Sequence, residues 1–155
     1  MNYNLRLDRV YDHPSQYLWQ ALTDRELLAQ WLMENTFEPQ VGHAFQFRAR
    51  PSFAFDGIVH CTVLEIDPRR RLVYTWQGNH MPQPTTVTWT LTDLPQGTHL
   101  RLEQTGFKGI RGWIIRLILK QGWQDLIGRA LPEVLSQLHS RDRSRRASSQ
   151  QWTNP

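Results

Sequence analysis

The sequence predicts a single α+β domain in which a curved antiparallel sheet wraps around a long C-terminal helix. Successive segments between residues 44 and 103 alternate apolar and polar side chains, which is the period of a β-strand. Short turns rich in Pro, Gly, Asn and Asp separate these segments, and tight connections favour antiparallel pairing. Residues 112–139 instead carry apolar side chains at helical spacing, so one long helix must cover one face of the sheet.

The elements before the sheet follow from shorter patterns. Apolar and charged residues alternate over residues 4–10, which predicts a first strand. A helix is expected over residues 14–22, because its first residue is a proline and that position needs no backbone N–H. Asp24 then caps a second short helix over residues 25–31. In the long C-terminal helix, Pro132 should cause a bend or begin a second segment.

Composition and charge narrow the classes of protein. Four arginines and one aspartate in residues 141–146 supply +3 of the formal net charge of +4, so no nucleic-acid partner is inferred. The single cysteine, Cys61, excludes an internal disulfide. No apolar run is long enough for a signal peptide or a membrane span, and a cytoplasmic location is expected. Residues 1–139 are expected to form the domain, and residues 140–155 a disordered basic tail.

Large aromatic side chains point to one side of several predicted strands. Alternation directs Phe45, Tyr74 and Trp89 toward the long helix. One helix rarely needs so many rings, and large rings leave voids that suit a flat apolar ligand, although a tightly packed core is the plainer interpretation. The residues expected to line or edge a ligand cavity are Phe45, Phe47, His60, Tyr74, Trp76, Trp89, Trp113 and Trp123.

Polar chemistry in this set is sparse. His60 lies in mid-strand, where a histidine is either held by structural hydrogen bonds or able to donate to a ligand or act as a general acid. Alternation places Cys61 on the opposite face of the strand, so the two cannot form a nucleophilic pair. Tyr74 has either a structural or a catalytic hydroxyl. The histidines lack the spacing of a metal site, so neither a metal nor a cofactor is expected.

Residues 108–120 (KGIRGWIIRLILK) combine basic and apolar side chains. We expect them to form the first turns of the gripped helix, buried on most sides. The alternative is a helix that makes weak contact with a membrane surface or forms an apolar portal for a ligand. Stable insertion into a bilayer is not expected, because the run is short and Arg116 interrupts it.

Several stretches resemble the START-like superfamily, and more narrowly its branch named after activators of the heat-shock-protein-90 ATPase. The resemblance spans about residues 5–139. One departure is the segment 110–119, which is more apolar than is usual in that branch. The matching stretches are residues 9–14 (RVYDHP), 18–24 (LWQALTD), 27–31 (LLAQW), 37–42 (FEPQVG), 65–76 (EIDPRRRLVYTW), 86–89 (TVTW), 97–98, 106–107 and 122–123.

The resemblance implies a helix-grip fold with a cavity between the sheet and the C-terminal helix. It leaves the function open, because relatives include lipid carriers, cyclases and co-chaperones. The first hypothesis is a binding domain for a small hydrophobic molecule that is non-enzymatic or at most weakly catalytic. The second is a cyclase or aromatase, which needs polar groups converging inside the cavity. The third is a co-chaperone-like module, which predicts an exposed apolar patch on the outer face of the sheet.

Overall fold

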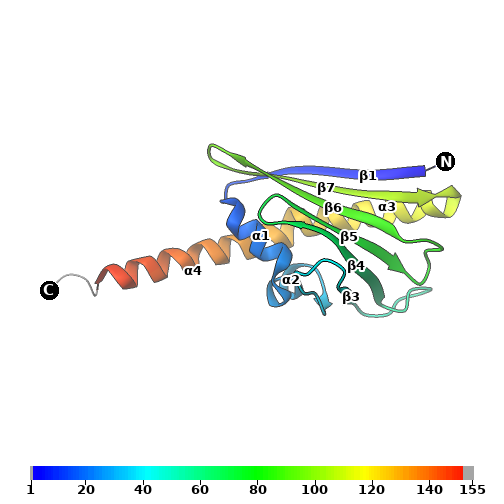
Figure 1. Ribbon diagram of the computed structural model, residues 1–155, viewed down its shortest axis with the longest axis horizontal. Helices are drawn as coiled ribbons and strands as arrows, with labels where there is room; N and C mark the ends of the chain where they lie inside the picture. The colour runs from blue at the N-terminus through cyan, green and yellow to red at the C-terminus, as the bar shows by residue number, and fades with distance from the viewer. Residues whose placement is uncertain (1, 152–155) are drawn as a thin grey trace.

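The computed structural model describes residues 2–151 and consists of one seven-stranded antiparallel sheet, two short helices and a long helical arm (Figure 1). The sheet order is β1-β7-β6-β5-β4-β3-β2. This arrangement confirms the predicted fold class and element order. The elements are β1 (Asn2–Tyr11), α1 (Ser15–Thr23), α2 (Arg25–Trp31), β2 (Glu34–Asn35), β3 (Ala44–Arg48), β4 (Ile58–Asp67), β5 (Arg71–Gly78), β6 (Thr85–Leu94), β7 (Gly97–Lys108), α3 (Gly109–Asp125), the π-helical turn η1 (Leu126–Ala130) and α4 (Leu131–Gln151).

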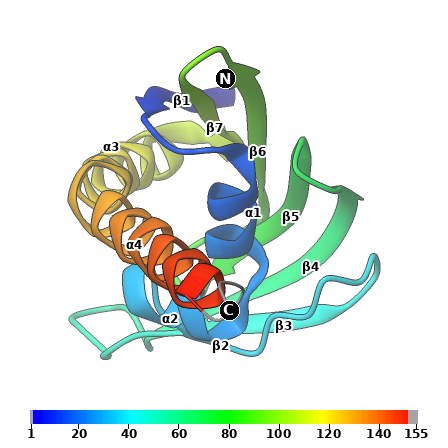
Figure 2. The same ribbon diagram turned by 90° about the vertical axis from the view of Figure 1, so that its left-hand side faces the viewer.

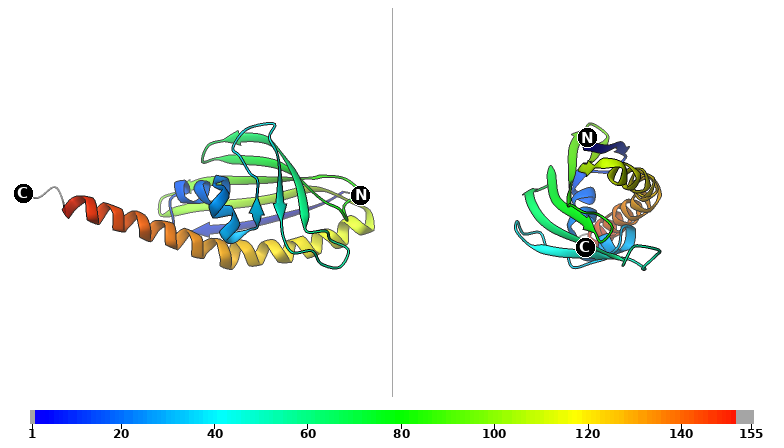
Figure 3. Two further views of the ribbon diagram at one scale, coloured as in Figure 1. Left: turned by 90° about the horizontal axis from the view of Figure 1, so that it is seen from below. Right: turned by 90° about the vertical axis from the view of Figure 1, so that its right-hand side faces the viewer.

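The sheet curves around the helices, as Figure 2 and the end view in Figure 3 show. The pairing register shifts in β1 between Tyr3 and Leu5, and in β4 between Val63 and Glu65. Irregularities of this kind bend a strand and increase its twist. The concave face of the sheet therefore packs against α1, α2 and the beginning of the helical arm, and the core lies between them.

Alternation along the strands separates the two faces of the sheet. In β6, Val87, Trp89 and Leu91 are buried against the helices, as the sequence predicts. Their neighbours Thr86 and Thr88 face outward and are partly exposed. Because the period of a strand is two, one face of β6 is apolar and packed, while its other face carries threonines.

The helical arm changes its hydrogen bonding where Pro132 approaches. The backbone N–H of Leu131 donates to the carbonyl of Leu126, one residue beyond the α-helical partner. Proline has no N–H, so nearby carbonyls in the preceding turn need other donors. Tyr11 supplies one, donating from its hydroxyl to the Ile127 carbonyl at 2.5 Å. Where the sequence predicts a bend or a second segment at Pro132, the structure has a π-helical turn, after which the arm continues as α4.

The arm continues past residue 139, where the sequence places the end of the domain. Near this point the hydroxyl of Tyr17 on α1 donates to the carboxylate of Asp142 at 2.5 Å. The ring of His139 stacks on Tyr17 with a centroid separation of 5.1 Å. The domain boundary and the disorder of residues 140–155 stay predictions, and residues 152–155 lie outside the described part. Within residues 2–151, no helix has both the length and the apolar character needed to cross a bilayer.

Candidate functional site

Six of the eight residues predicted to line a ligand site meet between the sheet and α3. They come from β3, β5, β6 and α3, and each has 5 % of its surface exposed or less. Alternation on the strands and an inward phase on the helix bring them together. We call them the aromatic interior: Phe45, Phe47, Tyr74, Trp76, Trp89 and Trp123.

The rings of the aromatic interior contact one another edge to face or at a tilt. Trp123 lies 5.2 Å from Trp76 and 5.4 Å from Trp89, measured between ring centroids. Phe47 lies 5.4 Å from Trp76 and 5.3 Å from Phe45. These separations are typical of favourable aromatic pairs. One continuous aromatic layer therefore joins the helical arm to the sheet.

A chain of hydrogen bonds crosses this apolar layer. The indole N–H of Trp123 donates to Oε1 of Gln104 at 2.9 Å. The amide of Gln104 donates to the hydroxyl of Thr85 at 2.8 Å, and that hydroxyl donates to the Trp76 carbonyl at 2.9 Å. Gln104 is fully buried, so each of these bonds prevents the desolvation penalty of an unpaired polar group.

The buried titratable groups are held neutral. Burial raises the pKa of the Tyr74 hydroxyl, which accepts a hydrogen bond from the Trp89 indole at 2.9 Å. Burial also raises the pKa of the Cys61 thiol. Among the side chains described for residues 2–148, the buried set contains no carboxylate, imidazole, ammonium or guanidinium group. In the described part of the chain, no three His, Cys, Asp or Glu residues are grouped so as to hold a metal ion.

A small hollow opens at the edge of the aromatic interior, where β7 turns into α3. We call it the mouth, and its volume is about 70 Å³. Its wall is mostly apolar, and Thr85 connects it to the buried hydrogen-bond chain. Gly112 lets the helix approach the strand closely, because a Cβ there would lie 3.0 Å from the Phe107 carbonyl carbon. The mouth is lined by Met81, Pro82, Gln83, Thr85, Gly106, Phe107, Lys108, Gly112 and Ile115.

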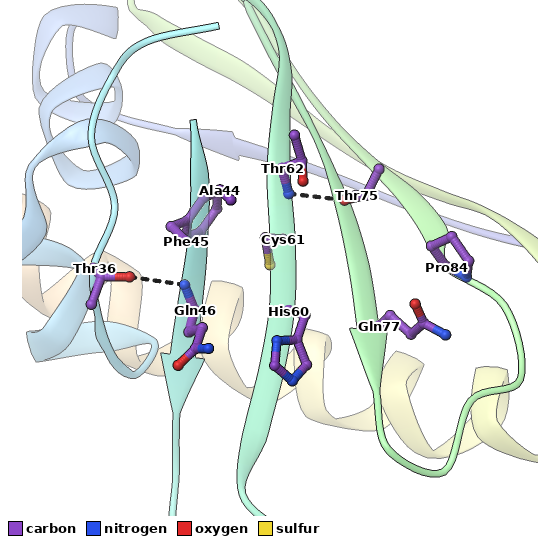
Figure 4. A pocket seen from close by; sticks show the side chains of 10 residues that line it. All are labelled: Thr36, Ala44, Phe45, Gln46, His60, Cys61, Thr62, Thr75, Gln77 and Pro84. Carbon is purple, nitrogen blue, oxygen red and sulfur yellow. Dashed lines mark hydrogen bonds between the residues drawn. The ribbon is translucent and has the colours of Figure 1, made fainter. Parts of the chain in front are cut away.

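His60 lies outside the aromatic interior. Its Cα pairs with that of Gln46 across β3 and β4, and its side chain is exposed on the outer face of the sheet. There it lines a shallow trough of about 590 Å³, in which Gln46 and Gln77 project from the same face (Figure 4). The same alternation directs Cys61 inward, so the predicted separation of His60 and Cys61 is confirmed.

Trp113 also lies outside the aromatic interior. It is 43 % exposed on the outer side of α3, whereas Ile115 and Trp123 of the same helix are buried. The expectation that residues 108–120 are buried on most sides is therefore wrong for the outer half of this segment. The reason is the helical phase: the inward residues 115, 119 and 123 recur every four positions and direct Trp113 away from them.

Other residues of the site were missed from the sequence. Gln104 had a usable signal, because it continues the inward alternation of Leu100 and Leu102 on β7. Met81 lies in the loop between β5 and β6, where no periodicity reveals which way a side chain points. Phe107 lies in β7 beyond the register shift against β1, which interrupts the alternation. Cross-strand packing alone brings them to the mouth.

A family model covers most of the domain. Residues 12–136 match the model described as activator of Hsp90 ATPase homolog 1-like protein. None of the curated proteins compared matches the chain.

Solved structures show the same fold. Protein MLL2253 from Mesorhizobium loti is 36 % identical, with a TM-score of 0.78 over 87 % of this chain and 98 % of its own. CV1439 from Chromobacterium violaceum is 27 % identical, with a TM-score of 0.68 over 85 % and 96 % of the two chains. DynU16, from the dynemicin biosynthetic locus, is 27 % identical, with a TM-score of 0.71 over 86 % of this chain and 47 % of its own.

Proposed function

Because the chain belongs to the activator of Hsp90 ATPase homolog 1-like family, we propose that it binds a small hydrophobic molecule between the sheet and α3. The fold of this family, within the START-like superfamily, is typically a ligand-binding one. The observation that supports the proposal for this chain is the mouth, whose residue Thr85 donates to the Trp76 carbonyl of the aromatic interior. Apolar burial would supply most of the affinity.

Ligand entry requires side chains at the mouth to move. The mouth measures about 70 Å³, whereas pockets for small molecules typically enclose about 300–1,000 Å³. Met81 is flexible and unbranched, so it can vacate space at low cost. Gly106 and Gly109 flank the end of β7 with φ values of 102° and 69°, a conformation that glycine adopts without strain. We propose that α3 yields at this junction and that the ligand occupies the space beside Ile115.

The hydrogen-bond chain offers a way to orient the ligand. Thr85 lines the mouth, and its hydroxyl oxygen also accepts a hydrogen bond from the side-chain amide of Gln104. A hydroxyl group on the ligand would donate to the remaining lone pair of the Thr85 oxygen inside an otherwise apolar wall. Few, well-placed polar groups of this kind set orientation in hydrophobic pockets.

The two alternative functions find less support in the same residues. A cyclase or aromatase needs an acid or base in the space between the sheet and α3. The buried titratable groups described there, Tyr74 and Cys61, are neutral. A co-chaperone-like module predicts an apolar patch on the outer face of the sheet. That face instead presents polar residues such as Thr62, Thr75 and Gln77 around the trough.

Titration with cis-parinaric acid, a fluorescent fatty acid, tests the proposal. Ile115→Phe fills the mouth, and we expect its affinity for the probe to fall at least tenfold, or about 1.4 kcal/mol. Ile118→Phe makes the same change on the exposed side of the same helix and should bind like the wild type. Equal affinity in all three proteins, or loss only in Ile118→Phe, would place the probe elsewhere and refute the proposal. Thr85→Val, which keeps the side-chain shape, should weaken binding without filling the mouth.

A further inference from the structure

The outer side of α3 carries a continuous row of exposed apolar side chains, which we call the α3 stripe. Its residues follow the spacing i, i+3, i+4, i+7 and i+8, which places them on one side of a helix. Contiguous apolar surface of this kind marks an interaction site more often than isolated exposed residues do. The α3 stripe consists of Ile110 (80 % exposed), Trp113 (43 %), Ile114 (47 %), Leu117 (43 %) and Ile118 (67 %).

Basic residues accompany the α3 stripe, and acidic residues are missing from the same stretch of sequence. Lys108, Arg111, Arg116 and Lys120 lie between residues 108 and 120, and no aspartate or glutamate occurs between Glu103 and Asp125. Within the described residues, Lys108, Arg111 and Lys120 have no carboxylate within ion-pair distance. The surface around the stripe is therefore positively charged.

No described element lies over the outer side of this helix. Figure 2 shows α3 and α4 forming one side of the molecule, with the curved sheet on the other. The inner side of α3 is occupied, because Ile115 and Trp123 are buried in the core. Arg116 reaches sideways and donates to the Asn4 carbonyl of β1 at 3.2 Å. The helix is thus fixed by one side and leaves the stripe open.

We propose that the α3 stripe docks on an anionic phospholipid surface. Apolar side chains and a tryptophan on one side of a helix, flanked by lysine and arginine, are the features that bind a helix in the plane of a membrane interface. The positive charge is complementary to anionic headgroups. A second copy of this chain is a poorer occupant, because antiparallel α3 stripes would bring two sets of cations together.

Docking would also place the mouth beside the lipid. Ile115 of the mouth and Ile114 of the α3 stripe are consecutive residues, about 100° apart around the helix axis. A hydrophobic molecule leaving the bilayer would then enter without crossing water. This last step rests on the proposed function, whereas docking itself does not.

Vesicle flotation tests the docking. The probes are vesicles of phosphatidylcholine alone and vesicles containing about 30 % phosphatidylserine, the anionic lipid that basic segments recognise. We expect binding to the anionic vesicles, weakened by added salt because screening reduces headgroup attraction. Ile118→Glu should weaken it at least tenfold, and Leu64→Glu, a matched change at an exposed residue of β4, should not.

Three results would overturn the proposal. The first is equal binding of the wild type and Ile118→Glu. The second is loss of binding on changing Arg143 and Arg145 to glutamine while Ile118→Glu still binds, which would assign the contact to the basic tail. The third is a wild type that does not bind the vesicles and instead forms a dimer, which Ile118→Glu converts to a monomer. Ile115→Phe should leave vesicle binding unchanged. A failure of the docking proposal can therefore be told apart from a failure of the ligand-binding proposal.

Discussion

The two helices of the C-terminal arm solve different packing problems. In α4, Leu131, Val134 and Leu135 are buried on one side and Leu138 packs against the same core, while most of the residues from 139 to 148 are polar. In α3, apolar residues are buried on one side and exposed on the other. Folding alone requires one buried face per helix. Packing in the fold accounts for the apolar residues of α4, whereas the outer side of α3 is where we propose an interaction.

The largest expected effect separates the two sides of α3. Trp123→Ala removes a buried ring that joins the helix to Trp76 and Trp89, and should lower the free energy of unfolding by about 3–5 kcal/mol. Ile118→Ala, on the exposed side, should change it by less than about 0.5 kcal/mol. Urea unfolding followed by circular dichroism measures both. Similar losses in the two variants would mean that the outer side is packed.

The next effect concerns the hydrogen-bond chain behind α3. Gln104→Leu leaves the Trp123 indole N–H without its acceptor and should cost about 1–3 kcal/mol of unfolding free energy. Gln124→Leu, at an exposed position of α3, is the matched control and should be close to neutral. In the double variant with Trp123→Phe, most of the Gln104→Leu cost should vanish, because no indole N–H remains to be satisfied. Strictly additive losses would show that the bond contributes nothing.

A smaller effect is expected at the junction between the helices. Tyr11→Phe removes the hydroxyl that donates to the Ile127 carbonyl and should cost about 1 kcal/mol. Thr88→Val, which removes a hydroxyl from the partly exposed outer face of β6, is the control. Thermal unfolding of the two variants distinguishes them. An unchanged midpoint in Tyr11→Phe would show that the carbonyls near Pro132 need no donor from β1.

The smallest effect is a pH dependence at α4. Nδ1 of His13 lies 3.0 Å from Nδ1 of His139, and burial together with this second histidine lowers the pKa of His13. The unfolded chain therefore binds a proton at His13 more readily, and stability falls as the pH drops through about 6.5. His13→Asn should reduce the loss of unfolding free energy between pH 7.5 and 5.5, and His60→Asn should not. Equal losses in the wild type and both variants would refute the assignment.

The sequence was informative where a local period decides the structure. Alternation placed Phe45, Tyr74 and Trp89 on one face because a strand turns every side chain by half a turn. The same period assigns His60 to the outer face, because Val59, Cys61 and Val63 of β4 alternate with it and are buried. Trp113 was misassigned because α3 is apolar nearly all round, so its phase could not be read. The mouth depends on loops such as the one that carries Met81.

The most direct test of the central claim is to locate the ligand by ¹H–¹⁵N NMR during titration with a fatty acid. If the ligand binds between the sheet and α3, the changes in amide chemical shift should concentrate around the mouth, at Met81, Thr85, Phe107 and Ile115. The indole N–H of Trp123 should shift as well, because it ends the hydrogen-bond chain that reaches Thr85. Shifts confined to His60, Thr62 and Gln77 in the outer trough, with the Trp123 signal unmoved, would contradict the account.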